Sequence, residues 1–383
     1  MDKRRKLILG SLLSLPLICE PIAIIGGTNG TLYVAIIHIV FFFYCMYSEI
    51  RYIKYRDIGI LLLFYSIFFL NMMIFPESKK FFFETGTLIA YLIYLPICVF
   101  SFQKIKEWDD FFILFKPLIY VATVVAFFLI VYVGSSSLKE SISYMQFSYF
   151  VLPPAMAAYT IFRKEKSSTF LTLFGILLFA LIAYSARATI LFLFIYIVVS
   201  ELTLSKHSKT ARYSLVLLFF SFVVLIANQN NIITYLRDIP VLENSRFLAK
   251  MAHAELFASA GREIIYDQTM VRLNNVGIEF SGLFGERKYL RGAYPHNFFY
   301  EIIMQMGWLV GSIILLWFVY LLIKFFLNKD NRIVSYFLFF GLFARYLISG
   351  SYLIEGRFWI FMFCMFSVIK SKMYSKAIYH KQV

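Results

Sequence analysis

The sequence predicts an all-helical integral membrane protein with about twelve transmembrane helices and one large outer loop. Hydrophobic residues make up 61% of the 383-residue chain and charged residues only 15%, below the roughly 25% that is typical of soluble domains. Apolar stretches follow one another along the chain, and only one long polar segment, residues 228–296, interrupts them. Because almost no polar linker is left, we expect residues 1–383 to form a single polytopic membrane domain.

Each apolar stretch is interpreted as a span because about 20 apolar residues cross a hydrocarbon core about 30 Å thick. The first stretch follows a basic segment, as in a signal peptide, but it is long and no small-residue cleavage site follows it. We therefore expect an uncleaved first span. The ninth span is short, and the tenth is long enough to begin at the membrane interface before it crosses. The predicted spans are residues 7–26, 31–48, 58–75, 85–102, 111–133, 144–162, 168–184, 188–204, 213–227, 298–326, 333–349 and 352–370.

The connecting loops predict the orientation of these spans. Alternate connections are rich in Lys and Arg, whereas the short loops on the opposite side hold little beyond Lys79, Lys80 and Lys139. Because cytoplasmic loops carry such an excess, we expect both termini in the cytoplasm and the loop of residues 228–296 outside. The net charge of +15 is then mostly topological, and no nucleic-acid partner is expected.

The chain lacks the usual signatures of metal and cofactor sites. All four cysteines (Cys19, Cys45, Cys98 and Cys364) lie in predicted spans, so we expect free thiols that pack as small apolar residues. No Cys/His cluster has zinc spacing, and neither a phosphate-binding glycine loop nor a Gly-x-Ser-x-Gly elbow occurs. We therefore expect neither a metal nor a cofactor.

Several charged residues lie at the predicted outer ends of spans. Arg187 lies in the tight turn between the seventh and eighth spans, Arg345 lies near the end of the eleventh, and Glu355 and Arg357 open the twelfth. Charges at membrane depth are costly, and those that face a cavity often mark a substrate path. The alternative for Arg345 and Arg357 is that they extend to the lipid headgroups or pair with Glu355. The turn that holds Arg187 is so short that we favour a functional role.

The outer loop contains a predicted helix from about residues 259–262 (Ser-Ala-Gly-Arg) to residues 275–277 (Asn-Val-Gly). Arg262 would lie in its first turn, where a guanidinium and free backbone N–H groups can both face an anion. The alternative is an ordinary surface helix, because basic and acidic residues nearly balance in this loop. Arg272, in the same predicted helix, is a secondary candidate.

His296 is the most specific candidate, because it joins the outer loop to the long apolar helix that follows. It lies between Pro295 and Asn297, and imidazole is well suited to accept a proton near neutral pH. Glu301 would orient His296 or face the headgroups, and Tyr294 is a secondary candidate beside it. The alternative for His296 is a helix cap without a chemical role.

The segment that begins with His296-Asn297 and continues to Gly307 and Gly311 resembles the signature of the O-antigen ligase and polymerase superfamily. The plan of about a dozen spans with one large outer loop before the histidine is similar as well. The resemblance extends to residues 184–187 (Tyr-Ser-Ala-Arg), 259–262 (Ser-Ala-Gly-Arg) and 280–285 (Phe-Ser-Gly-Leu-Phe-Gly). In residues 184–187, Ala186 separates the serine from the arginine, which departs from the superfamily pattern.

The resemblance implies a metal-independent, inverting glycosyltransferase in the bacterial cytoplasmic (inner) membrane. Its donor would be a glycan on undecaprenyl pyrophosphate, and a chain-length regulator and a flippase would be its partners. A polymerase transfers that glycan to a fresh lipid-linked repeat unit, whereas a ligase transfers it to lipid A-core. The superfamily roles fall on Arg187 and Arg262 as pyrophosphate ligands and on His296 as the residue that activates the acceptor hydroxyl.

The modest loop and the compact, very apolar chain favour a polymerase that makes O-antigen or capsular polysaccharide, with the ligase as the first alternative. A lipid-linked oligosaccharide flippase or another twelve-span transporter is the second alternative. A transporter of that kind would show internal repeats and mid-span charges along a central path, such as Glu20. No internal repeat is seen, and the candidate residues lie at the outer rim.

Overall fold

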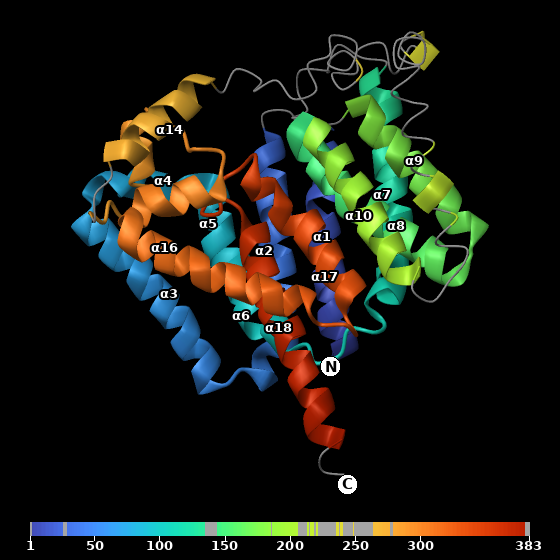
Figure 1. Cartoon of the computed structure of the whole chain (residues 1–383), viewed down its shortest axis with the longest axis horizontal. Helices are drawn as coiled ribbons and strands as arrows, with labels where there is room; N and C mark the ends of the chain where they lie inside the picture. Colours follow the sequence, from blue (N-terminus) through green and yellow to red (C-terminus); the bar gives the residue numbers. More distant parts are fainter. Residues whose placement is uncertain are drawn as a thin grey trace. The chain divides into compact units, whose positions relative to one another are not determined.

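The computed structural model of the chain describes residues 2–25, 29–134, 144–184, 186–205, 263–275 and 279–379, with a few separate positions between 213 and 248 (Figure 1). All regular secondary structure in these residues is helical, with no strand among them, which confirms the predicted all-helical class. The chain divides into two compact units. Unit 1 holds residues 3–37 and 108–258, and unit 2 holds residues 38–107 and 259–383. The single polytopic domain stays a prediction.

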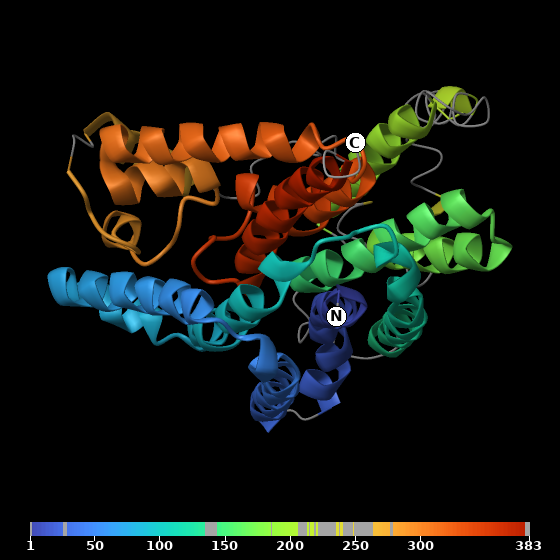
Figure 2. The ribbon, with the colours of Figure 1, turned by 90° about the horizontal axis from the view of Figure 1, so that it is seen from below.

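Unit 1 is built around helices that lie side by side in Figures 1 and 2. An ion pair with a fully buried carboxylate joins α8 to α10: Arg163 donates from Nε and Nη2 to the two carboxylate oxygens of Glu201, at 2.5 and 2.8 Å. The hydroxyl of Tyr159 donates to the same carboxylate at 2.6 Å. The helices of this unit are α1 (Asp2–Ile25), the start of α2 (Gly30–Glu49), α7 (Phe111–Gly134), α8 (Tyr144–Glu165), α9 (Ser168–Tyr184) and α10 (Arg187–Ser205).

Unit 2 holds the long helix α16 and the segments that pack near its start. Helix α18 packs against α16 and against the run from η4 to η5, and α14 lies beside α16 in both ribbon views (Figures 1 and 2). The elements of this unit, after the end of α2, are η2 (Ile50–Tyr52), α3 (Tyr55–Ile74), η3 (Pro76–Ser78), α4 (Lys79–Phe82), α5 (Thr85–Ile89), η4 (Ala90–Tyr94), α6 (Leu95–Phe100), η5 (Phe102–Lys104), α14 (Glu263–Asn275), α15 (Glu286–Tyr289), α16 (Phe298–Phe326), α17 (Arg332–Leu338), η7 (Phe339–Phe343), η8 (Ala344–Leu347) and α18 (Gly356–Tyr379).

Seven helical segments among the described residues are long and apolar enough to cross a membrane, as expected of a membrane protein. The predicted ninth span, residues 213–227, lies mostly outside the described residues. Each other predicted span largely coincides with one helix or with consecutive helical segments. The total of twelve spans stays a prediction. The seven segments are Asp2–Ala23, Leu32–Tyr52, Tyr55–Ile74, Thr85–Lys104, Phe111–Val131, Arg187–Leu204 and Phe298–Phe326.

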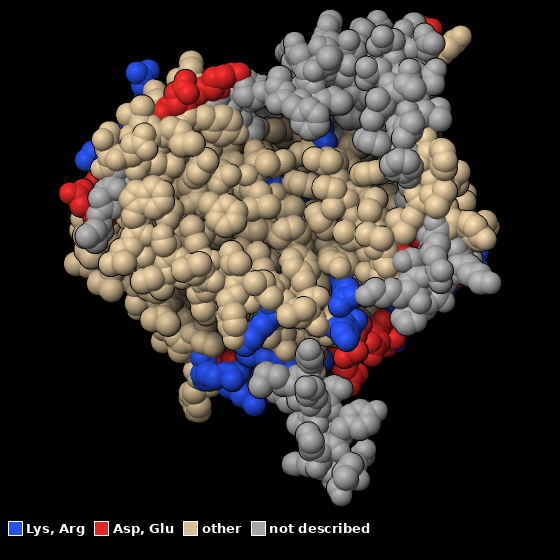
Figure 3. Space-filling view, in the orientation of Figure 1, with Lys and Arg blue, Asp and Glu red and all other residues tan. Residues whose placement is uncertain are grey.

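The surface over α16 is almost free of charged side chains between its ends (Figure 3). Large apolar side chains on this helix are exposed, among them Trp308, Leu316 and Trp317. Lipid tails stabilise such a surface, whereas water would not. Gly307 interrupts α16 with φ 71° and ψ 170°, so the helix consists of two helical parts joined at this residue.

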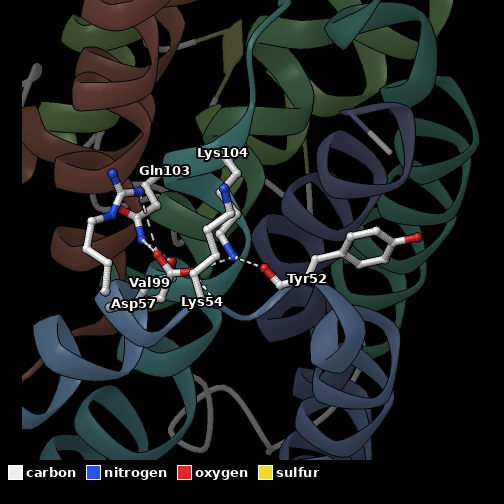
Figure 4. Close-up of polar contacts among 7 residues, drawn as sticks. Tyr52, Lys54, Asp57, Val99, Gln103 and Lys104 are labelled. Atoms are coloured by element: carbon white, nitrogen blue, oxygen red, sulfur yellow. Dashed lines mark hydrogen bonds and ion pairs between the residues drawn. The ribbon is translucent and has the colours of Figure 1, made fainter.

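Asp57 fixes the first turn of α3 (Figure 4). Its fully buried carboxylate lies 2.7 Å from Lys104 Nζ, and it accepts hydrogen bonds from Gln103 Nε2 at 3.2 Å and from the backbone N–H of Lys54 at 3.1 Å. A buried charge is stable only when it is paired and hydrogen-bonded in this way. The first turn of α3 is therefore tied to the end of the helical run 85–104.

Candidate functional site

The segment of residues 279–297, here called the site loop, is anchored to the far end of α3 by one buried side chain. Asn71 Oδ1 accepts from the backbone N–H of Leu283 at 2.7 Å, and Asn71 Nδ2 donates to the Leu283 carbonyl at 3.3 Å. Gly282 has φ +81°, and a Cβ at this position would lie 2.3 Å from the ring of Phe75. A glycine is therefore required for the loop to approach α3 this closely.

The start of α16 is fixed by Asn297, which is its N-cap. Its Oδ1 accepts from the backbone N–H groups of Phe299 and Tyr300 at 3.0 and 3.3 Å, as expected of an N-cap asparagine. Its Nδ2 donates to the carbonyl of Leu347, in η8, at 3.0 Å. His296 precedes this cap with φ +56°, a left-handed conformation that is uncommon for residues other than glycine. The hydrogen bonds of Asn297 to the first turn of α16 and to η8 therefore fix the backbone directly after His296.

Tyr294 lies at the centre of the candidate site. Its ring centroid is 4.3 Å from that of His296, and the guanidinium carbon of Arg287 lies 5.3 Å from the Tyr294 ring. Burial raises the pKa of Tyr294, so its hydroxyl stays protonated at neutral pH, and the nearby charges of Glu355 and Arg345 act on it in opposite directions. Tyr294 and His296, both candidates from the sequence, thus lie among the charged groups of Arg287, Arg345 and Glu355.

Arg345 and Glu355 form an ion pair across the turn between η8 and α18. Arg345 Nη2 lies 2.7 Å from Glu355 Oε1, and the hydroxyl of Tyr346 donates to Glu355 Oε2 at 3.3 Å. Gly350, with φ +95°, passes so close that a Cβ there would lie 3.4 Å from the Glu355 carboxylate. Arg357 is buried near this pair and interacts electrostatically with both of its members. The pairing that the sequence left open for Glu355 is thus observed with Arg345.

Two carboxylates in this region are fully buried: Glu286 at the start of α15 and Glu301 in the first turn of α16. Gln305 Nε2 donates to Glu286 Oε2 at 2.7 Å and accepts from Tyr352, while Glu301 accepts a hydrogen bond from Ser351. Burial raises the pKa of Glu286 to about 7. The hydrogen bond from Ser351 holds the Glu301 carboxylate towards the turn before α18. The predicted orienting role of Glu301 toward His296 stays a prediction.

The remaining predicted residues lie elsewhere. Arg187 is the first residue of α10 in unit 1, half-buried, and the N–H of the preceding Ala186 donates to Ser148 Oγ at 2.8 Å. Arg262 lies outside the described residues, directly before α14. Arg272, near the end of α14, places its guanidinium carbon 3.8 Å from the ring centroid of Tyr289. A cation–π contact with a neighbouring tyrosine is a structural role for Arg272.

Sequence reasoning missed Arg287 and Gln305. The only signal for Arg287 is its place two residues after the segment 280–285, and Gln305 carries no signal beyond a polar side chain in an apolar helix. Both matter here, because Arg287 adds a buried cation beside Tyr294 and Gln305 binds Glu286. The arrangement in unit 2 thus combines one imidazole with three buried guanidinium groups, which suits proton transfer beside a bound anion.

Within the described residues, no group of three or more His, Cys, Asp or Glu side chains is placed so that it could hold a metal ion. Comparisons with protein-family models, with curated proteins and with solved structures found no match for this chain.

Proposed function

We propose that the protein is a membrane glycosyltransferase that polymerises undecaprenyl-pyrophosphate-linked oligosaccharide repeat units into O-antigen or capsular polysaccharide. The observation that carries this proposal is that His296 contacts Tyr294, which lies in the field of the buried Arg345, while Arg357 is buried near Arg345. A base beside clustered arginines suits the transfer of a sugar from a pyrophosphate leaving group. The resemblance of the His296 segment to the O-antigen ligase and polymerase superfamily supports the same function.

In this proposal the protein has about twelve spans in the bacterial cytoplasmic membrane, with both termini in the cytoplasm. Residues 228–296 then lie at the outer face, where lipid-linked repeat units are joined. The apolar surface of the candidate spans and the positive-inside distribution of Lys and Arg support this placement.

The proposed reaction uses His296 as a general base. Neutral imidazole takes the proton from the acceptor sugar hydroxyl while the hydroxyl oxygen attacks the anomeric carbon of the donor glycan. The bond between that carbon and the pyrophosphate oxygen breaks, and undecaprenyl pyrophosphate leaves with the electron pair. Attack from the opposite face inverts the anomeric configuration. His296 later returns the proton to solvent.

Arginine side chains, rather than a metal ion, supply the positive charge in this proposal. A guanidinium binds phosphate oxygens through parallel N–H groups and remains charged at any relevant pH. Arg187 and Arg262 are the pyrophosphate ligands that the resemblance implies. In unit 2, Arg345 acts on Tyr294, which contacts His296, and Arg357 lies near Arg345. Such fixed charges stabilise the developing negative charge on the leaving group.

The experiment that tests the proposal is deletion of the gene, followed by complementation with wild type, His296→Ala, Arg262→Ala or Lys288→Ala. Lys288 is exposed on the site loop and is the matched control. Surface polysaccharide is separated on a gel, and protein levels in the membrane are measured by immunoblot. We expect the deletion and the first two variants to leave single repeat units on the acceptor, and the control to restore full ladders.

Other outcomes would replace the proposal. Long lipid-linked chains that never reach lipid A-core would identify a ligase. Repeat units trapped on the cytoplasmic leaflet would identify a transporter. Normal ladders in the deletion strain would exclude both transferase functions.

A further inference from the structure

Arg287 is buried with most of its hydrogen-bonding capacity unused. The side chain is 6% exposed, and its Nη1 donates to the carbonyl of Gly292 at 3.0 Å. Its Nε and Nη2 are buried and have no hydrogen-bond partner among the residues that the structure describes. The nearest carboxylate oxygen, Glu286 Oε1, lies 3.7 Å from Nε, beyond hydrogen-bonding distance. The one bond to Gly292 thus leaves the Nε and Nη2 donors of a permanent cation unsatisfied.

Unsatisfied donors on a buried charge are rare in folded proteins, because each loses its hydrogen bonds to water without a replacement. A guanidinium cannot avoid the loss by releasing its proton, since its pKa is too high. The unused donors therefore require either a partner that arrives from outside the chain or a compensating role that outweighs the loss.

Three aromatic rings lie close to the Arg287 guanidinium. Its carbon lies 4.9 Å from the ring centroid of Phe81, 5.4 Å from that of Phe284 and 5.3 Å from that of Tyr294. Phe284 has φ +65°, so the loop accepts an uncommon backbone conformation where it presents one of these rings. Aromatic rings at these distances favour the charged guanidinium. The three contacts are present before any ligand binds.

The two unused atoms form one edge of the guanidinium. Nε–H and one Nη2–H point in nearly the same direction in the planar fork, which matches two oxygens of a phosphate or carboxylate group. Tyr294 neighbours both Arg287 and His296, so the Arg287 guanidinium belongs to the candidate site. Arg345 acts on the same tyrosine, and Glu355 acts on it in the opposite direction.

We propose that Arg287 binds phosphoryl oxygens of the diphosphate of the lipid-linked substrate through Nε and Nη2, beside His296. This inference rests on the proposed function and assigns the diphosphate end of the substrate to a residue of the site loop. The competing explanation is a purely structural pair, in which Arg287 serves only to neutralise Glu286 and to hold the turn at Gly292.

The test measures diphosphate binding to the full-length protein in lipid nanodiscs, with undecaprenyl pyrophosphate, inorganic pyrophosphate and undecaprenol as separate probes. Arg287→Lys keeps the charge but lacks the paired edge. The double variant Glu286→Gln with Arg287→Gln removes both buried charges together, which avoids leaving one of them alone. Lys288→Ala is the control on the same turn. Unfolding temperatures are measured for every variant.

We expect Arg287→Lys to weaken the binding of undecaprenyl pyrophosphate roughly tenfold to a hundredfold, the range for hydrogen bonds to a charged group. The double variant should weaken it at least as much, and Lys288→Ala should leave it unchanged. Weaker binding of inorganic pyrophosphate in the same variants places the contact on the phosphates. Unchanged undecaprenol binding excludes an effect through the lipid tail.

Wild-type affinity for undecaprenyl pyrophosphate in Arg287→Lys and in the double variant would overturn the inference and identify a structural pair. So would loss of undecaprenol binding in parallel with loss of diphosphate binding. The proposed function is tested separately, because diphosphate binding is measured without polymer formation. Arg287-dependent binding in a protein whose gene deletion leaves polysaccharide ladders intact would refute the polymerase and retain this binding site.

Discussion

Replacement of Asn71 should detach the site loop from α3. In wild type this side chain satisfies both the N–H and the C=O of Leu283, and its Nδ2 also donates to Ser78 Oγ at 3.1 Å. Leu283 is 7% exposed, so water does not replace these partners in the folded protein. Asn71→Leu keeps the volume of the side chain but removes every hydrogen bond, whereas Asn71→Ala adds a cavity.

The magnitude follows from the two backbone groups that are left buried without partners. Each such group costs about 1–3 kcal/mol, so Asn71→Leu should lower the free energy of unfolding by about 2–6 kcal/mol. Asn71→Ala should cost more, because a cavity is added. The matched control is Asn275→Ala at the exposed end of α14, where the expected change is about 0.5 kcal/mol or less.

The assay is equilibrium unfolding of the purified protein in mixed micelles, together with limited proteolysis of residues 279–297. Faster cleavage of the loop should accompany the loss of stability in both Asn71 variants. A free energy of unfolding of Asn71→Leu within about 0.5 kcal/mol of the wild-type value would contradict this prediction, because two buried backbone groups without hydrogen-bond partners destabilise the protein by more than that.

Three further predictions concern the same region. Asn297→Ala removes the cap of α16 and the bond to Leu347, and should destabilise the protein by about 2 kcal/mol in the same unfolding assay; no change would show that the cap is dispensable. Gly282→Ala should cost roughly 2–5 kcal/mol, because an alanine at positive φ also overlaps a phenylalanine ring, while Gly59→Ala, with no atom within 4 Å, should be neutral or stabilising. Burial raises the pKa of Glu286 to about 7, above its unfolded value of roughly 4.3, so the stability that its protonated form contributes is complete below about pH 4.3 and is lost as pH rises through 7. Glu286→Gln should therefore make the unfolding temperature less dependent on pH between about pH 5 and 8, and parallel curves for the two proteins would contradict this.

The sequence predicts the helices of this chain well where local signals mark both ends. The predicted tenth span and α16 begin and end at the same residues, Phe298 and Phe326, because Pro295 and Asn297 mark the start and a polar segment marks the end. The interruption at Gly307, which divides α16 into two helical parts, was not predicted. The fourth span, by contrast, contains the π-helical turn Ala90–Tyr94, and the eleventh is divided into α17, η7 and η8. Such irregular turns depend on packing against neighbouring helices, which hydropathy does not report.

The candidate site shows the same division. His296 and Tyr294 were predicted from their position at a helix start and are neighbours in the structure. Arg287 was not predicted, because its buried environment is formed in part by Phe81, which is distant in the sequence and contacts Arg287 only after folding. Arg262 lies outside the described residues, and Arg187 belongs to unit 1, so their shared role with His296 stays a prediction.

The interruption at Gly307 separates the first part of α16, next to the candidate site, from the longer apolar part that follows it. At 1.5 Å per residue, residues 308–326 extend over about 28 Å, close to the thickness of a hydrocarbon core. Just before the interruption, the carbonyl of Gln305 accepts a hydrogen bond from the N–H of Ser281 at 2.9 Å, which ties the first part to the site loop. The two parts also pack against each other, since a Cβ at Gly311 would lie 3.2 Å from Ile303 Cα. A bilayer thickness that changes the tilt of residues 308–326 is therefore expected to act on the first part of α16 and on the geometry around His296.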